Sequence, residues 1–264
     1  MTDYSTSRWA DKAFADGYAD RADAIIFERR RLIGVLKSFY SHHYGTKKRV
    51  HVLDLGCGDG TLTEELAKEF GNVVPTLMDG SEDMLAKAQI RLGECCPGAS
   101  YECASFQEVL AGDAALPEAD FMFSSLAIHH LDKAEKAALF RRIHARLING
   151  GHFVNVDVVL PPPGVEGWYL KMWREWIDGQ RHLLEVPEDS VDIPSQYKGN
   201  TDNKPDSLAS QMRALFAAGF RDVDCYYKHG LFAVYGGKKV AREGLDYEAD
   251  ADEPEDGRDW DFAD

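Results

Sequence analysis

The stretch Val52–Phe70, VLDLGCGDGTLTEELAKEF, decides the fold of this chain. Residues 50–55 are mostly apolar with one acid among them, which is typical of a strand buried inside a parallel sheet. Gly56, Gly58 and Gly60 follow at alternate positions, where the absence of a Cβ lets backbone approach a ligand closely. The residues after them carry leucine and phenylalanine at helical spacing. Strand, glycine turn and helix together predict the first half of a β-α unit that binds a nucleotide-like cofactor.

The glycine turn differs from two other common phosphate-binding turns. A dinucleotide fingerprint would have its third glycine at the position of Thr61, and a P-loop would need a lysine well before Lys68. The spacing that begins at Asp54 is D-x-G-x-G-x-G. It resembles the first motif of class I S-adenosylmethionine-dependent methyltransferases. The same spacing disfavours a nicotinamide-dependent dehydrogenase.

A second strand-like run, Val73–Asp79, ends in an acid 25 residues after Asp54. A carboxylate at the end of the second strand can accept hydrogen bonds from both ribose hydroxyls of a nucleoside. By itself Asp79 could equally be an ordinary loop acid, and its combination with the glycine turn favours the ribose role. Ser81 follows as a predicted N-cap, with two acids in the first turn of the next helix.

The middle of the chain continues this pattern. We expect a short third strand over 98–104 and a fourth strand over 119–126, after which His129 and His130 follow. Asp132 can cap a helix over 133–148, which an Asn-Gly-Gly turn would end.

The second half of the chain supplies the remaining elements. A fifth strand is expected over 152–159, with Asp157 near its carboxyl end. A proline-rich break then leads into a helix with three tryptophans that continues toward Leu184. Pro205 is expected to begin the last helix, and residues 218–239 read as two closing strands.

The order and spacing of these motifs over residues 48–157 resemble the small-molecule type of class I methyltransferase, with domains of type 11 or 12. The resemblance implies an α/β fold: a Rossmann-like, seven-stranded, doubly wound sheet with an antiparallel last strand, N-terminal helices and a helical cap insertion. Ligands of open α/β sheets bind beyond the carboxyl ends of the strands. The residues that the resemblance implies for binding S-adenosyl-L-methionine are Asp54, Gly56, Cys57, Gly58, Asp79, Gly80, Met84, Ala104, Ser105, Phe106, Ser124, Leu126 and Tyr18.

The resemblance also suggests how parts of the cofactor are bound. The end of the third strand borders the adenine ring in this fold, usually with an acid near the exocyclic amine. Here Ser105 would be the polar group, and Phe106 would cover the ring. One arginine of 29–31 could pair with the methionine carboxylate.

Charge is distributed unevenly along the 264 residues. The net charge is −15, and residues 243–264, with 11 acids and one base, carry −10 of it, which leaves −5 for the rest. We therefore expect an N-terminal helical segment over the cofactor site (1–48) and a methyltransferase domain (49–240) with a helical cap inserted at about 162–204. Residues 241–264 are expected to form a disordered acidic tail.

Composition limits the partners and the compartment. An acidic body without a cluster of lysine and arginine disfavours nucleic acid. No apolar run is long enough for a membrane span, and the N-terminus lacks the apolar region of a secretory signal. The five cysteines are odd in number and lack zinc-type spacing. We expect free thiols, no metal site and a cytoplasmic location.

Methyl transfer from a sulfonium is an in-line displacement, so alignment and exclusion of water can supply most of the catalysis. A general base is needed only if the acceptor arrives protonated. His129 and His130 are the candidate catalytic residues, because imidazole titrates near neutral pH. Either histidine could instead be a hydrogen-bonding residue of the core. Asp157 could orient a substrate amine or satisfy backbone groups.

The leading hypothesis is therefore an S-adenosylmethionine-dependent methyltransferase that acts on a small-molecule acceptor. Two alternatives remain: an enzyme that uses a carboxylated S-adenosylmethionine, and a non-catalytic regulatory protein that binds S-adenosylmethionine. The aromatic cap could shape the acceptor pocket or form a homodimer contact.

Overall fold

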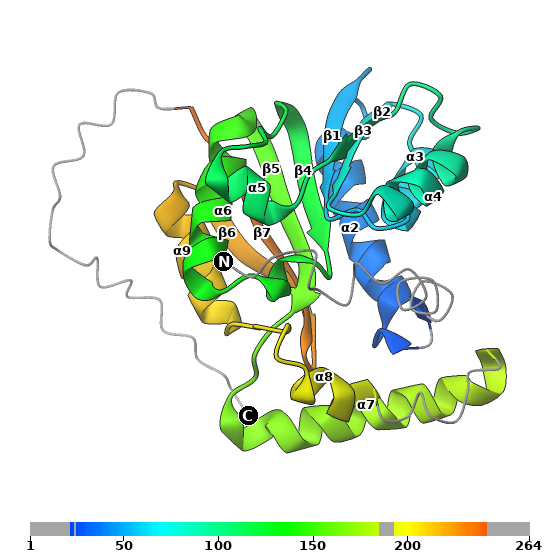
Figure 1. Ribbon diagram of the computed structural model, residues 1–264, viewed down its shortest axis with the longest axis vertical. Coiled ribbons are helices and arrows are strands. Elements are labelled where there is room, and N and C mark those ends of the chain that lie inside the picture. Colours follow the sequence, from blue (N-terminus) through cyan, green and yellow to red (C-terminus); the bar gives the residue numbers. More distant parts are fainter. Residues whose placement is uncertain (1–21, 24, 185–192, 242–264) are drawn as a thin grey trace, which may run out of the picture.

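One sheet forms the centre of the molecule (Figure 1). The computed structural model describes residues 22–23, 25–184 and 193–241. The strands are β1 (Val50–Leu55), β2 (Val73–Asp79), β3 (Ser100–Cys103), β4 (Ala119–Ser125), β5 (Leu147–Val158), β6 (Arg221–His229) and β7 (Phe232–Lys238). They pair in the order β3-β2-β1-β4-β5-β7-β6. β1 to β5 are parallel, and β7 is antiparallel to both β5 and β6. The predicted seven-stranded α/β fold is confirmed.

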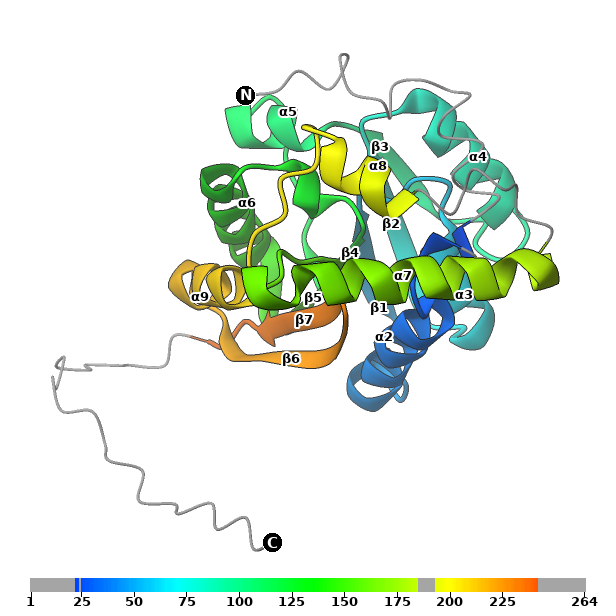
Figure 2. The same ribbon diagram turned by 90° about the horizontal axis from the view of Figure 1, so that it is seen from below.

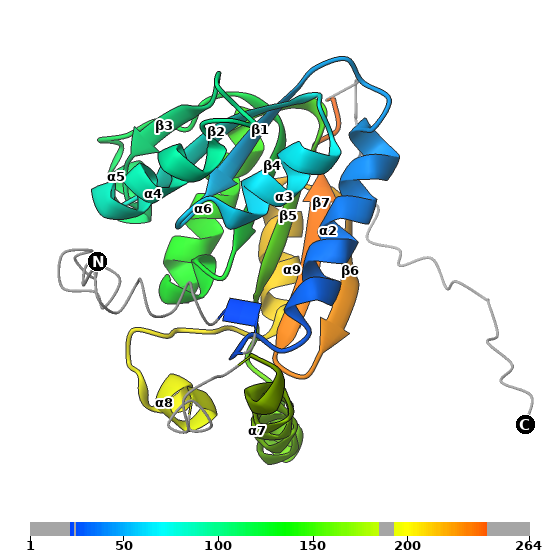
Figure 3. The same ribbon diagram turned by 90° about the vertical axis from the view of Figure 1, so that its right-hand side faces the viewer.

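Helices cover both faces of this sheet (Figure 3). They are α2 (Arg29–Tyr44), α3 (Thr61–Glu69), α4 (Glu82–Leu92), α5 (Phe106–Ala111), α6 (Lys133–Arg146) and α9 (Leu208–Ala218), with a 3₁₀ turn η3 (Ile128–His130). Side chains alternate along the strands, so Val52 and Phe121 pack on the face of α2 and α3. Leu53 and Met122 pack on the opposite face with α6 and α9. This alternation produces the doubly wound arrangement.

Several element boundaries differ from the sequence prediction. α6 ends at Arg146 rather than Ile148, and β5 begins at Leu147, which pairs with Ala119 of β4. The Asn-Gly-Gly turn therefore lies within β5, where Gly150 has φ +82° and its N–H donates to Lys239 O at 2.7 Å. α9 begins at Leu208 rather than Pro205, because the Ser207 side chain caps the helix by accepting from the Ser210 N–H. Strand pairing sets the boundary between α6 and β5, and capping sets the start of α9.

The predicted N-caps Ser81 and Asp132 are confirmed. Ser81 accepts a hydrogen bond from the Met84 N–H, and Asp132 forms a capping box with Glu135.

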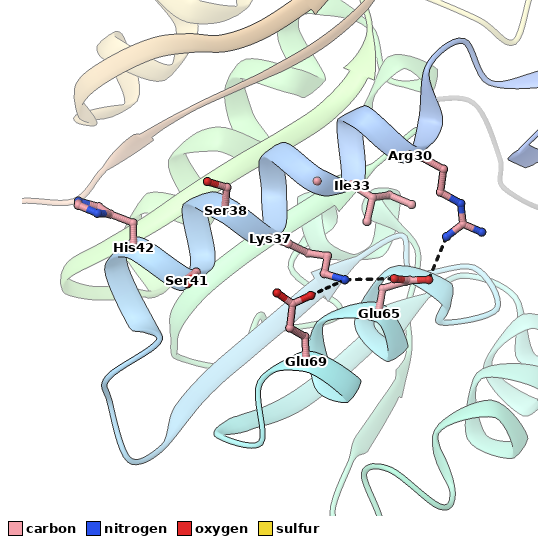
Figure 4. A pocket seen from close by; sticks show the side chains of 9 residues that line it. Arg30, Ile33, Lys37, Ser38, Ser41, His42, Glu65 and Glu69 are labelled. Carbon is pink, nitrogen blue, oxygen red and sulfur yellow. Dashed lines mark hydrogen bonds and ion pairs between the residues drawn. The ribbon is translucent and has the colours of Figure 1, made fainter.

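α2 packs on one face of the sheet and is linked to α3 by ion pairs, which Figure 4 shows from close by. Lys37 Nζ lies 2.5 Å from Glu69 and 3.4 Å from Glu65, and Arg30 lies 3.1 Å from Glu65. Arg29 and Arg30 both pair with Asp23. Two arginines of the run 29–31 thus have acidic partners within the protein.

The predicted insertion forms two helices, α7 (Pro163–Leu184) and α8 (Ile193–Gly199). Both lie across the carboxyl ends of the parallel strands, as the view from below shows (Figure 2). Trp173 is the buried anchor of α7: it is 4% exposed, and its Nε1 donates to Ile25 O at 2.6 Å. Trp168 is 59% exposed on the same helix.

All five cysteines lie in the described part and are free thiols, as predicted. Among the described residues, no helix combines the length and apolarity needed to cross a membrane. In that same part of the chain, no three His, Cys, Asp or Glu side chains gather closely enough to hold a metal ion.

Candidate active site

The glycine turn after β1 presents bare backbone at the carboxyl edge of the sheet. Gly56 has φ +68°, and a Cβ placed there would lie 2.5 Å from Ala127 Cβ. Gly58 has φ +55°, and a Cβ placed there would meet no atom within 4 Å. Gly60 is different, since its Cβ would meet Leu92 of α4 at 2.9 Å. Gly56 is therefore required by packing, and Gly58 borders open space that a ligand could fill.

Asp79 ends β2 directly beside this turn. One carboxylate oxygen accepts from the Gly58 N–H at 2.9 Å, and the other accepts from the Ser81 N–H at 2.9 Å. Burial raises the pKa of Asp79, and the backbone N–H groups of Gly58, Ser81 and Gly80 oppose that rise. The carboxylate is held in place by backbone, and carboxylate oxygens have further lone pairs with which to accept hydroxyl groups.

Asp54 has a different environment from Asp79. It is 2% exposed and accepts a hydrogen bond from Thr63 Oγ1 at 2.7 Å, which ties β1 to α3. Burial raises the pKa of Asp54 to about 7, although the Thr63 hydrogen bond opposes the rise. The side chain is thus part of the support beneath the glycine turn.

The end of β3 brings the residues expected near adenine to the same edge. The Ala104 N–H donates to Asp79 O at 3.0 Å. The Phe106 ring lies beside Gly56, with Cζ 3.4 Å from the position that a Cβ on Gly56 would take. Ser105 caps α5: its hydroxyl donates to Glu108 Oε2 at 2.8 Å and accepts from the Glu108 N–H at 3.2 Å. The Ser105 hydroxyl is thus engaged in capping α5, a role that differs from the one predicted for it beside the adenine ring.

The chain turns sharply where β4 ends. Ser124 is fully buried, and its hydroxyl donates to Leu55 O at 2.7 Å, which ties β4 to β1. Leu126 has φ +53°, a strained value for a leucine, and its N–H donates to Val156 O at 2.8 Å. This turn directs the following residues toward β5.

His129 and Asp157 form a buried pair at this point. His129 Nδ1 lies 2.6 Å from Asp157 Oδ1, and the two residues are 5% and 0% exposed. Asp157 Oδ1 also accepts from the Val158 N–H at 2.8 Å. A histidine whose Nδ1 is held by a carboxylate has its Nε2 available as a base. Both residues were predicted site candidates, but no local pattern pairs them; their one signal in the sequence is that each lies near the end of one of two consecutive strands.

His130 has a different set of contacts. Its Nδ1 lies 3.2 Å from Asp202 O, in the segment that returns from the cap. Burial, helped by the nearby His129, lowers the pKa of His130 to about 3. The same returning segment donates from the Lys204 N–H to His129 O at 2.8 Å, and Lys204 O accepts from Lys136 Nζ. The structure therefore separates the two histidines: His129 is oriented by an acid, and His130 contacts the cap segment.

Aromatic side chains connect the cap to the His129–Asp157 pair. The ring centroids of Tyr197 in α8 and His129 lie 6.0 Å apart, and those of Trp173 in α7 and Tyr197 lie 5.7 Å apart. Trp173 also makes an edge contact with Phe232 at 5.2 Å. The space beside the pair is thus bordered by aromatic residues.

Most of the predicted cofactor residues come together at the carboxyl edge, from the ends of β1 to β4. Cys57 lies in the glycine turn, where its N–H donates to Met78 O at 3.0 Å. Met84 is buried in the first turn of α4, 6% exposed, so it lies beneath the Asp79 turn. Tyr18 lies outside the described residues.

Comparison with known proteins identifies relatives. A family model described as a methyltransferase domain matches residues 52–151. An uncharacterized methyltransferase of Synechocystis sp. is 32% identical over 110 residues, which are 42% of this chain and 48% of that protein. Trans-aconitate 2-methyltransferase of Acidovorax sp. is 34% identical over 153 residues, 56% of this chain and 54% of that protein. This chain thus spans about half the length of the curated relatives it matches.

A solved structure shares the fold over a larger part of the chain. The magnesium protoporphyrin IX methyltransferase from Synechocystis, with bound S-adenosylhomocysteine, superposes with a TM-score of 0.61. The alignment covers 88% of this chain and 96% of that one at 13% identity.

Proposed function

We propose that this chain, whose residues 52–151 belong to the methyltransferase domain family, transfers a methyl group from S-adenosylmethionine to a small-molecule acceptor. The observation that carries the proposal is the His129–Asp157 pair at 2.6 Å on the same edge of the sheet as the glycine turn and Asp79. A base and a nucleoside-binding turn on one edge suit a group-transfer enzyme. The buried base favours catalysis over a purely regulatory binding role.

The residues present suit the cofactor. Gly58 offers backbone with positive φ beside open space, where a Cβ would meet no atom within 4 Å. Asp79 offers a fixed carboxylate for the ribose hydroxyls, and Phe106 offers a ring face for adenine. S-adenosylmethionine supplies an electrophilic methyl group on a sulfonium when bound.

His129 then acts as the general base for an acceptor that carries a proton. Asp157 fixes the Nδ1–H tautomer and stabilises the imidazolium, so Nε2 can take the proton of the acceptor hydroxyl. With S-adenosylmethionine bound, the acceptor oxygen would bond to the methyl carbon as the bond from that carbon to the sulfonium sulfur breaks with its electron pair left on sulfur, and His129 would hold the proton of the acceptor. The aromatic side chains of the cap exclude water from this space.

The paired base favours one acceptor class. A carboxylate acceptor is already ionised near neutral pH and needs no base, whereas a phenol must lose a proton. The trans-aconitate enzyme is named for a carboxylate substrate. The fully buried Asp157 would repel a carboxylate bound beside His129. We therefore favour a weakly acidic hydroxyl, such as a phenol.

Release of S-adenosylhomocysteine from S-adenosylmethionine tests this function. Panels of phenols, aliphatic alcohols, thiols and carboxylates are offered to the wild-type protein, to His129→Ala and to His42→Ala, an exposed histidine on α2. We expect phenols to be accepted, with kcat/KM lowered roughly 100-fold or more in His129→Ala and unchanged in His42→Ala. Turnover restricted to carboxylates, or full activity of His129→Ala, would contradict the role of the base.

A further inference from the structure

The carboxylate of Asp157 is held by a row of buried side chains from three elements. Its Oδ2 accepts from Asn155 Nδ2 of β5 at 3.3 Å. The same Nδ2 donates to the Tyr235 hydroxyl of β7 at 2.7 Å. Tyr235 in turn donates to Gln211 Oε1 of α9 at 2.5 Å. Asn155 and Tyr235 are 0% exposed and Gln211 is 1% exposed, so bulk water does not compete for these contacts.

The direction of each hydrogen bond in the row is determined by the one before it. Gln211 Oε1 can only accept, so the single proton of the Tyr235 hydroxyl points toward Gln211. The Tyr235 oxygen then presents a lone pair to Asn155, which attracts the amide hydrogens rather than the amide oxygen. With Nδ2 held there, its second hydrogen faces Asp157 Oδ2.

Asn155 shows the effect of this constraint. Its Oδ1 is buried and has no hydrogen-bond partner within the described residues. An unpaired buried acceptor is unfavourable, and the amide keeps this orientation because both hydrogens of Nδ2 are used. Reversing the amide would place Oδ1 against an oxygen of Asp157, where no hydrogen lies between the two acceptors to form a bond.

Gln211, the last residue of the row, is itself held by a hydrogen bond to Asp206. Gln211 Nε2 donates to Asp206 O at 3.3 Å, and Asp206 Oδ2 accepts from Ser210 Oγ at 2.7 Å in the first turn of α9. The Leu160 N–H also donates to Asp206 O at 3.0 Å, directly after β5. Gln211, which accepts from Tyr235, is therefore itself held in place by Asp206.

We propose that Tyr235 and Gln211 are positioning residues that act through Asn155 to hold Asp157 in the orientation that fixes the Nδ1–H tautomer of His129. The catalytic meaning of this role rests on the proposed function, but the role itself is a property of the His129–Asp157 pair. Neither residue touches the histidine, and each acts only through the row of hydrogen bonds.

A second buried tyrosine provides a matched control. Tyr44 is 1% exposed, and its hydroxyl lies 2.7 Å from Nδ1 of His152 and 2.8 Å from Asp120 O. This contact involves Asp120, near the start of β4, and His152, which pairs with Phe121 of β4, away from His129 at the carboxyl end of that strand. Tyr44→Phe and Tyr235→Phe each remove one buried hydroxyl and keep the ring.

The experiment follows the two histidines by NMR in the full chain labelled with ¹⁵N-histidine. His129→Gln and His152→Gln assign the signals. In Tyr235→Phe we expect His129 to lose its slowly exchanging Nδ1–H resonance and to shift toward the Nε2–H tautomer, with His152 unchanged. In Tyr44→Phe we expect the signals of His152 to change and those of His129 to stay as in the wild type. Unchanged His129 signals in a cooperatively folded Tyr235→Phe protein would overturn the proposal.

A second variant covers the case in which Tyr235→Phe does not fold. Gln211→Met removes the acceptor of the tyrosine proton on the buried face of α9, and the same change at His129 is expected. If an acceptor substrate is found, kcat should fall about tenfold in Tyr235→Phe with little change in KM. The NMR result does not depend on methyl transfer, so it can fail or succeed independently of the proposed function.

Discussion

Asp79 uses both carboxylate oxygens to hold backbone N–H groups, one from the glycine turn and one from the turn after β2. Asp79→Ala should weaken S-adenosylmethionine binding by about 10- to 100-fold, because the ribose hydroxyls lose a charged acceptor. We expect the variant to keep the fold, because the pairing of β1 with β2 is made by the backbone. Calorimetric titration measures the affinity, with Asp83→Ala on the exposed first turn of α4 as the control. Equal affinities for the two variants would refute the ribose role.

Gly56 and Gly58 both have positive φ, but their surroundings differ. Gly56→Ala combines left-handed strain with a contact of 2.5 Å to Ala127 Cβ, so unfolding should become easier by about 2–5 kcal/mol. Gly58→Ala meets no atom within 4 Å, so only about 1–2 kcal/mol should be lost. The added methyl group should nevertheless reduce cofactor affinity strongly.

Urea denaturation and calorimetric titration separate the two effects of the glycine substitutions. A Gly58→Ala protein that binds the cofactor as tightly as the wild type would show that the open space beside this residue is not the cofactor site.

At the scale of elements, Lys136 of α6 forms a hydrogen bond to the segment 200–206, which returns from the cap. It is 2% exposed, and its Nζ donates to Lys204 O, while the Lys204 N–H donates to His129 O. Burial lowers the pKa of Lys136. Lys136→Met should speed amide hydrogen exchange across residues 200–206, because that segment loses its link to α6.

Stability of the Lys136→Met protein should change by only about 1–2 kcal/mol, since methionine fills a similar volume and the buried charge is removed. Lys133→Met, an exposed lysine on the same helix, is the control for exchange measured by mass spectrometry. Matching exchange in both variants would show that the cap segment does not depend on Lys136.

The whole molecule contains buried titratable groups with opposing effects on stability. Burial lowers the pKa of His130 and of His152 to about 3, against about 6.5 in an unfolded chain. The stability that these two neutral histidines contribute is therefore fully present above pH 6.5, and it is lost as the pH falls from about 6.5 to about 3. Burial raises the pKa of Asp54 to about 7, so its contribution has the opposite sign and falls as the pH rises from about 4 to 7.

Two variants should change this pH dependence in opposite directions. Between pH 4.5 and 6.5 each group contributes a slope of about 1.4 kcal/mol per pH unit. His152→Gln removes a positive slope and should flatten the rise of stability with pH. Asp54→Asn removes a negative slope and should steepen it. Urea denaturation at several pH values measures both, and a flatter profile in Asp54→Asn would contradict the buried, protonated state of this acid.

The sequence predicted the architecture well because its signals are local. The strand before the glycine turn, the acid at the end of β2 and the caps at Ser81 and Asp132 each depend on residues within a few positions of one another. The family model of a methyltransferase domain matches residues 52–151, and the solved methyltransferase shares the fold. The boundaries of α6 and α9 were missed, because pairing of Leu147 with Ala119 and capping by Ser207 decided them.

The amino-acid sequence by itself determined the sheet, the glycine turn and the acid beside it, since periodicity and turn chemistry are encoded within short segments. Only the tertiary structure decided that His129 lies against Asp157. His129 and Asp157 are 28 residues apart, and they meet because β4 and β5 lie side by side and Leu126 turns the chain in a left-handed conformation. The support from Asn155, Tyr235 and Gln211 likewise depends on β7 and α9 folding back against β5. A hydrogen bond of this kind requires atoms within about 3 Å, and only the complete packing of the sheet and helices brings them that close.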